Sequence, residues 1–79
     1  MAQGPGDRYE IVYDPAESTA YIYRYVPGGI CGPLTARVAV PDRTAAEDEA
    51  LRHGLLRSGP WRTASTASQQ YAPAERVTL

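Results

Sequence analysis

The sequence of 79 residues contains no lysine, no phenylalanine and no asparagine, and its only cysteine is Cys31. A single cysteine cannot form an internal disulfide, and small secreted domains usually depend on several, so we expect a reducing, cytoplasmic setting. The three missing residue types share A/T-rich codons, which is typical of a high-GC genome, such as that of an actinobacterium or one of its phages. Six tyrosines remain, although their codons also begin with T and A, which indicates that they matter to the structure or its surface.

Long apolar runs are also missing. No stretch approaches the roughly 20 apolar residues that span a bilayer, and the beginning of the chain, MAQGPGDRYE, lacks the apolar core of a signal peptide. Residues 1–7 contain glycine and proline and are predicted to form a flexible N-terminus, followed by one domain over residues 8–79. A domain this small buries only about 60% of its unfolded surface, so good packing or an oligomer must supply stability.

The charge is balanced, because eight arginines are scattered among nine acidic residues and the net charge is −1. A domain that relies on phosphate contacts normally has a clear positive excess on one face. General nucleic-acid binding and binding to a membrane surface are therefore disfavoured.

The first half of the domain predicts an antiparallel hairpin. Residues 8–14 (RYEIVYD) and 20–26 (AYIYRYV) read as strands, and the intervening Pro15 supplies turn chemistry. Successive side chains of a strand point to opposite faces. One face of the second strand therefore carries a row of three tyrosines: Tyr21, Tyr23 and Tyr25.

Two pairing registers are open for this hairpin, and a slip by one residue exchanges the faces. If Asp14 lies opposite Thr19, Ile11 faces Ile22 and the tyrosine row lies on the other face. If Tyr13 lies opposite Thr19, the tyrosines share a face with Ile11. We favour the first register because it gathers the aliphatic side chains on one face.

A loop over residues 27–33 (PGGICGP) leads to a third predicted strand over residues 34–40 (LTARVAV), whose alternate side chains from Leu34 to Val40 share a face. After the helix described below, two interpretations compete. Either residues 61–66 and 70–77 form a final hairpin, or residues 62–70 form a loop that leads to one short strand.

The predicted helix begins at Thr44, which forms a capping box with Glu47. Acidic residues follow at the start and arginines toward the end, as the helix dipole favours. Gly59 is the predicted left-handed residue at the C-terminus, and Pro60 prevents continuation. One helical face is expected to carry Ala50, Leu51, Gly54 and Leu55, while His53, Arg57, Glu49 and Ala46 point away from it.

These elements predict an α+β fold, in which one helix packs on one face of a small antiparallel sheet in the order β-β-β-α-β or β-β-β-α-β-β. The opposite face of the sheet is left open. The predicted core consists of Ile11, Ile22, Val26, Val38, Val40, Leu51, Leu55 and Trp61, with Val77 as a further candidate.

Catalytic, cofactor and metal sites are not expected. Cys31 and His53 are the only candidates for a nucleophilic pair, but His53 is predicted to project away from the sheet. One cysteine and one histidine cannot supply the four ligands of a structural zinc site. The glycine-rich loop cannot be a Walker phosphate loop, because the chain has no lysine.

The tyrosine row has three interpretations: a protein-contact or self-association face, a stacking platform for single-stranded nucleic acid, or an ordinary strand surface. The arginines that would meet phosphate in the second interpretation are Arg8, Arg24, Arg37 and Arg62. We expect a small non-enzymatic cytoplasmic protein that contacts an unknown protein partner or a second copy of itself, with no membrane partner. The alternative is a small nucleic-acid-binding protein. The candidate partner-contact residues are Tyr21, Tyr23 and Tyr25.

Overall fold

The computed structural model describes residues 8–65 and 67–77. The elements are β1 (Arg8–Asp14), β2 (Thr19–Tyr25), β3 (Gly32–Pro33), β4 (Val38–Ala39), α1 (Arg43–Arg52), β5 (Leu55–Arg57), β6 (Arg62–Thr63) and β7 (Gln70–Arg76). The strands form one sheet in the order β3-β2-β1-β7-β5, and β4 also pairs with β2 while β6 pairs with β7.

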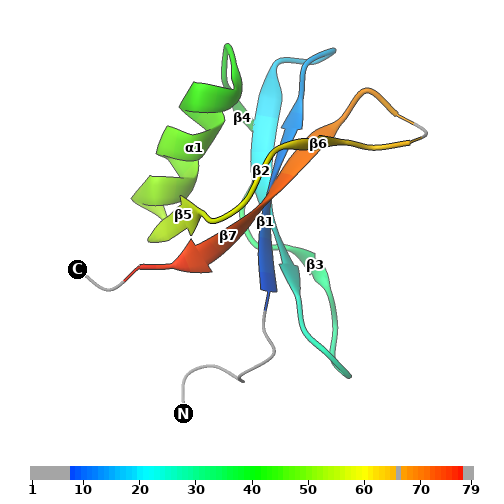
Figure 1. The fold of residues 1–79 in the computed structure, drawn as a ribbon, viewed down its shortest axis with the longest axis vertical. Coiled ribbons are helices and arrows are strands. Elements are labelled where there is room, and N and C mark those ends of the chain that lie inside the picture. Colours follow the sequence, from blue (N-terminus) through cyan, green and yellow to red (C-terminus); the bar gives the residue numbers. More distant parts are fainter. Residues whose placement is uncertain (1–7, 66, 78–79) are drawn as a thin grey trace.

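Every strand pair is antiparallel, and α1 packs on one face of the sheet (Figure 1). The predicted α+β class is confirmed, although the sheet has more strands than expected because several are only two or three residues long. The predicted flexible segment 1–7 lies outside the described residues.

The β1–β2 hairpin has the favoured register. Asp14 lies opposite Thr19 and Ile11 lies opposite Ile22, and both isoleucines are fully buried. In the turn, the amide of Ala16 donates to a carboxylate oxygen of Asp14 at 3.0 Å. The prediction is confirmed. The physical reason is that only this register buries both isoleucines on the face that α1 covers.

The third strand is broken, contrary to the prediction of one strand over residues 34–40. It is replaced by β3 and β4, which pair with the two ends of β2. Between them, the Leu34 amide donates to the Ile22 carbonyl at 2.7 Å, and the Ile22 amide donates to Thr35 Oγ1 at 3.0 Å. The hydroxyl of Thr35 therefore replaces a backbone carbonyl. Leu34, which was predicted to share a face with Val40, is 41% exposed, whereas Val40 is buried.

The start of the helix also differs from the prediction. The N-cap is Asp42, not Thr44, and its side chain accepts a hydrogen bond from the Ala45 amide at 2.9 Å. Aspartate is as good an N-cap as threonine. Glu47, which was assigned to a capping box, instead accepts a hydrogen bond from Trp61 Nε1 at 3.0 Å.

The helix is shorter than predicted, because it ends at Arg52 and not near Gly59. Gly54 has φ = 77°, so it is the left-handed residue that terminates α1. The next three residues form β5 and pair with β7. Leu55 therefore enters the core from a strand and not from the helix.

The inward face of α1 is formed by alanines. Ala46 and Ala50 are buried, whereas Leu51 is 46% exposed. The predicted helical face was therefore wrong for Ala46 and Leu51. Small side chains let the backbone of α1 lie close to the sheet, and the side chains of β1 and β2 then fill the space between them.

The core lies between α1 and the face of the sheet that carries Ile11. Of the predicted core residues, Ile11, Ile22, Val40 and Leu55 are buried, and Val38 and Trp61 pack against them while partly exposed. Val26 and Val77 are only partly buried and lie outside this cluster. The prediction omitted Tyr9, Tyr13, Ala20, Ala46, Ala50 and Ala74.

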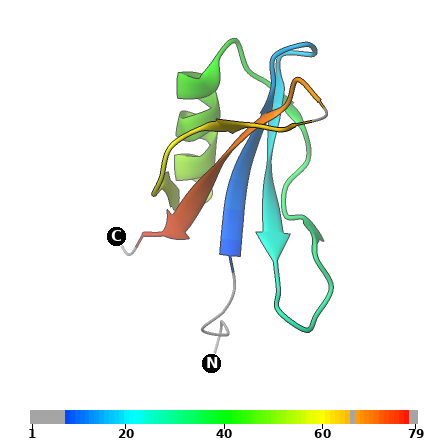
Figure 2. The same ribbon diagram turned by 45° about the vertical axis from the view of Figure 1, so that its right-hand side comes forward.

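The C-terminal region forms the hairpin that was one of the two interpretations. Arg62 of β6 lies opposite Tyr71 of β7, and the Ala64 amide donates to the Gln69 carbonyl at 2.9 Å. Further along β7, Ala74 to Arg76 pair with β5, while Gln70 to Ala74 pair with β1. In Figure 2 the yellow segment that follows β5 leads into this hairpin, whose second strand, β7, is orange to red.

Candidate functional site

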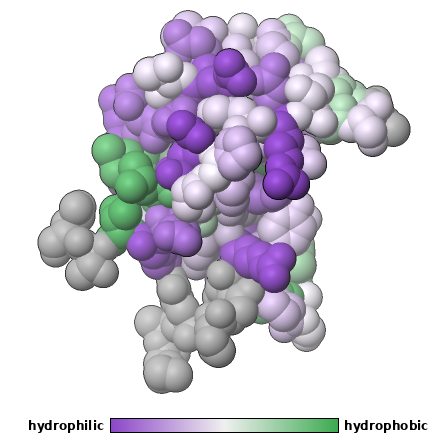
Figure 3. Space-filling view, in the orientation of Figure 1, coloured by the Kyte–Doolittle hydropathy of each residue, from purple (hydrophilic) through white to green (hydrophobic). Residues whose placement is uncertain are grey.

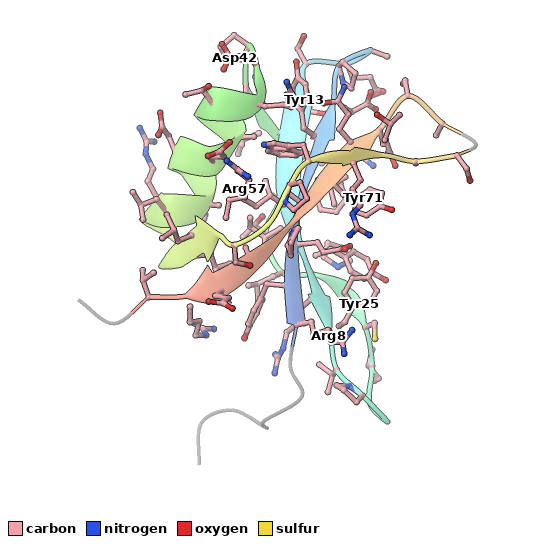
Figure 4. All side chains as sticks on the ribbon, viewed as in Figure 1. Arg8, Tyr13, Tyr25, Asp42, Arg57 and Tyr71 are labelled. Atoms are coloured by element: carbon pink, nitrogen blue, oxygen red, sulfur yellow. The ribbon has the colours of Figure 1, made fainter. Side chains whose placement is uncertain are left out.

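The face of the sheet opposite α1 carries tyrosines from two non-adjacent strands, three from β2 and one from β7. Across the sheet, Tyr21 lies opposite Val12, which lies opposite Tyr71. In the next row, Tyr23 lies opposite Glu10. Figure 4 shows Tyr25 and Tyr71 on the side of the sheet away from α1. We call this surface the tyrosine face; its residues are Glu10, Val12, Tyr21, Tyr23, Tyr25 and Tyr71.

The three predicted contact residues therefore lie together on the uncovered face. Tyr25 is 41% exposed, and Tyr21 and Tyr23 are half-buried. The rings of Tyr23 and Tyr25 lie with their centroids 4.7 Å apart and their planes tilted by 52°. Such a tilted pair is a favourable aromatic contact, so the row presents ordered rings to solvent.

Sequence reasoning missed Tyr71. Its half-buried ring joins the tyrosine face because β7 pairs with β1 in a register that places Tyr71 opposite Val12. The alternation in β7, in which Ala72 and Ala74 are buried, could have indicated that Tyr71 points the other way. The strand partner of β7, however, could not be read from the sequence.

The tyrosine face is hollowed. A cavity of about 380 Å³ is lined by the residues of the tyrosine face and is bounded by Ala64 and Gln69 from the β6–β7 hairpin. None of the described residues that line it is an arginine. The cavity therefore combines four phenol rings with one carboxylate, that of Glu10.

Glu10 changes the acidity of a neighbouring phenol. Burial, a hydrogen bond to Glu10 and the negative charge of Glu10 together raise the pKa of Tyr25 from 10.0 to about 12. The Tyr25 hydroxyl therefore remains protonated at neutral pH and donates to the carboxylate. This hydrogen bond links Tyr25, the last residue of β2, to Glu10 of β1.

The arginines lie around the tyrosine face rather than in its centre. The guanidinium carbon of Arg37 lies 5.1 Å from the centroid of the Tyr21 ring, which is a cation–π contact. Arg8 and Arg62 are exposed and lie opposite Tyr25 and Tyr71. Arg24 was considered for the same surface, but it lies opposite Tyr9 and so belongs to the other face of the sheet.

Cys31 and His53 have separate partners. The thiol of Cys31 lies in the loop after β2, where its sulfur is 3.3 Å from the amide nitrogen of Val26. His53 caps α1, and its Nε2 lies 3.4 Å from a carboxylate oxygen of Glu49. In the part of the chain that the structure describes, no three histidine, cysteine or acidic side chains are grouped to hold a metal ion.

The chain matches no family model, no curated protein and no solved structure. Within residues 8–65 and 67–77, the structure contains no helix of sufficient length and apolarity to cross a membrane. The function must therefore be argued from the surface itself.

A second apolar area lies on the helix side. Leu51 of α1 is 46% exposed and Leu56 of β5 is 54% exposed. In Figure 3 a hydrophobic area is visible on the left of the molecule, where the end of α1 and β5 lie. These two leucines are useful for control variants, because they are exposed apolar side chains outside the tyrosine face.

Proposed function

We propose that this chain is a small non-enzymatic cytoplasmic protein that acts by binding another protein, or a second copy of itself, through the tyrosine face. The observation that carries the proposal is the set of four tyrosines on the one sheet face that the helix leaves uncovered. Tyrosine is enriched at the energetic centres of protein interfaces, because its ring buries a large area and its hydroxyl tolerates water.

The rigidity of the surface favours binding. All four tyrosines project from paired strands, and Tyr25 is further held by Glu10 and by the neighbouring ring of Tyr23. Side chains that are already ordered lose little conformational entropy when a partner covers them. The interaction energy of the rings is then available for association.

The alternative function, stacking of single-stranded nucleic acid on the tyrosines, is supported by Arg8, Arg37 and Arg62 around the rings. Against it, Glu10 lies within the cavity, where its charge would repel phosphate. The net charge of −1 also supplies no general attraction. A protein partner is therefore the better-supported proposal.

The experiment compares the double variant Tyr21→Ala/Tyr23→Ala with the control variant Leu51→Ala/Leu56→Ala. Both remove two exposed or half-exposed side chains, but only the first alters the tyrosine face. We expect the tyrosine variant to keep its circular dichroism spectrum and to lose association in sedimentation velocity and in pull-downs, while the control behaves as the wild type. Unchanged association of the tyrosine variant would contradict the proposal.

A salt titration tests the alternative. Binding of single-stranded oligonucleotides that falls steeply with rising ionic strength would support nucleic-acid recognition. The absence of binding at low salt would remove it.

A further inference from the structure

The cavity of the tyrosine face has the composition of a site for an organic cation. Four phenol rings surround the carboxylate of Glu10 in a volume of about 380 Å³. We propose that this cavity binds the guanidinium group of an arginine presented by the protein partner. The inference rests on the proposed function, because it names the chemistry by which the tyrosine face would recognise its partner.

The tyrosine rings of the cavity can attract a cation. The face of a tyrosine ring carries negative electrostatic potential and attracts a cation placed over it. This chain already uses that interaction, since Arg37 lies 5.1 Å from the Tyr21 centroid and Arg76 lies 5.2 Å from the Tyr9 centroid. Arg37 contributes to a different cavity from the one that contains Glu10, so the central site is not filled by it.

Glu10 places a negative charge in the same cavity. The described residues include no cation that forms an ion pair with Glu10; the ion pairs found there involve Glu47 and Glu49. A partner that covers the tyrosine face removes water from this carboxylate, and an uncompensated buried carboxylate is strongly unfavourable. The partner must therefore bring a positive charge to the centre of the interface.

The geometry favours arginine over lysine as the source of that charge. A guanidinium group is planar, so it can lie against a phenol ring while its N–H groups donate to both oxygens of a carboxylate. The hydrogen bond from Tyr25 leaves most of the acceptor capacity of Glu10 available, because a carboxylate has about four acceptor positions. An ammonium group would satisfy the charge but could not stack.

The test uses three capped pentapeptides with glycine on both sides of a central arginine, citrulline or lysine. Citrulline has nearly the shape of arginine but no charge. Each peptide is titrated into the isotopically labelled full chain at low ionic strength, and binding is followed by the chemical shifts of Glu10 and of the tyrosine rings. We expect the arginine peptide to shift the signals of Glu10, Tyr23 and Tyr71 in the millimolar range, and the citrulline peptide to cause no such shift.

Two variants locate the site. Glu10→Gln should weaken binding of the arginine peptide at least about tenfold, because a charge-assisted hydrogen-bonded pair is lost. Glu75→Gln removes the same charge from an exposed residue of β7 that does not line the cavity, and it should leave binding within about twofold of the wild type. Circular dichroism establishes that both variants are folded.

Several results would overturn the inference. These are equal binding of the citrulline peptide, tighter binding of the lysine peptide, equal loss in the Glu10→Gln and Glu75→Gln variants, or no shift with any peptide. The proposed function and the arginine site can be refuted independently of each other. If Tyr21→Ala/Tyr23→Ala abolishes protein association while no arginine peptide binds, the interface stands and the arginine site does not.

Discussion

Glu47 of α1 and Trp61 of the segment after β5 are joined by a hydrogen bond of 3.0 Å from the indole nitrogen to a carboxylate oxygen. The same oxygen lies 3.1 Å from Nε of Arg57 in β5. One carboxylate therefore ties the helix to the strand that follows it and to the tryptophan that closes over the core. Figure 4 shows Arg57 between α1 and the sheet.

Loss of these contacts should lower the stability of a domain this small. We expect Glu47→Ala to lower the free energy of unfolding by about 1–2 kcal/mol, because the partly buried indole N–H and the Arg57 guanidinium lose their acceptor. Urea denaturation, monitored by the fluorescence of Trp61, measures this change in the free energy of unfolding. Glu49→Ala, which removes surface contacts to Arg52 and His53, should cost less than about 1 kcal/mol; equal losses would contradict this account.

The helix terminus can be tested at Gly54. Its φ of 77° is unfavourable for any residue with a Cβ, although no atom would obstruct that Cβ. We expect Gly54→Ala to destabilise the protein by about 1 kcal/mol. Gly32→Ala is the matched control, since its Cβ also meets open space and its φ is ordinary. If α1 continued beyond this point, Gly54→Ala would instead stabilise the protein.

The side chain of Thr35 completes the edge of β2. We expect Thr35→Val to lower the free energy of unfolding by about 1–3 kcal/mol, because the Ile22 amide loses its acceptor while the shape of the side chain is kept. Thr63→Val in β6 is the control, because Thr63 is exposed. Chemical denaturation of the two variants decides the matter, and a neutral Thr35→Val would show that the amide has another partner.

These relationships explain why some elements could be predicted and others could not. The register of the first hairpin follows from local sequence, because only one pairing buries both Ile11 and Ile22. The position of the helix end does not follow from local sequence. Gly54 and Gly59 both fit the C-terminal pattern, and Leu55 suits either a helix or a strand. The choice is made by β7, which lies about 20 residues later and pairs with β5.

The candidate site was predicted only in part, because some of its residues are brought together by a strand that lies far away in the sequence. The row of Tyr21, Tyr23 and Tyr25 requires only the period of a strand and the hairpin register. Tyr71 and the cavity around Glu10 require the pairing of β1 with β7, which the sequence does not specify. Thr35 was missed because a side chain there replaces a backbone acceptor, and no periodic pattern reveals this substitution.

The phenol of Tyr25 gives a pH-dependent prediction. Its pKa in the folded protein is raised from 10.0 to about 12, so the fold binds this proton more tightly than the unfolded chain does. The resulting stabilisation is complete below pH 10 and is lost as the pH rises toward about 12. The pKa of Tyr25 is measured by following the NMR signal of one of its ring carbons as the pH is raised. Glu10→Gln should lower this pKa. A Tyr25 pKa near 10 in the wild type would contradict the contact with Glu10.

The most direct measurement of the central claim is the accessibility of each tyrosine ring to a photo-excited flavin dye, recorded by NMR with and without the bound protein partner. In the free protein, Tyr21, Tyr23, Tyr25 and Tyr71 should react, whereas the buried Tyr9 and Tyr13 should not. In the complex, the first four should become protected. Tyrosines of this face that remain accessible in the complex would contradict the account.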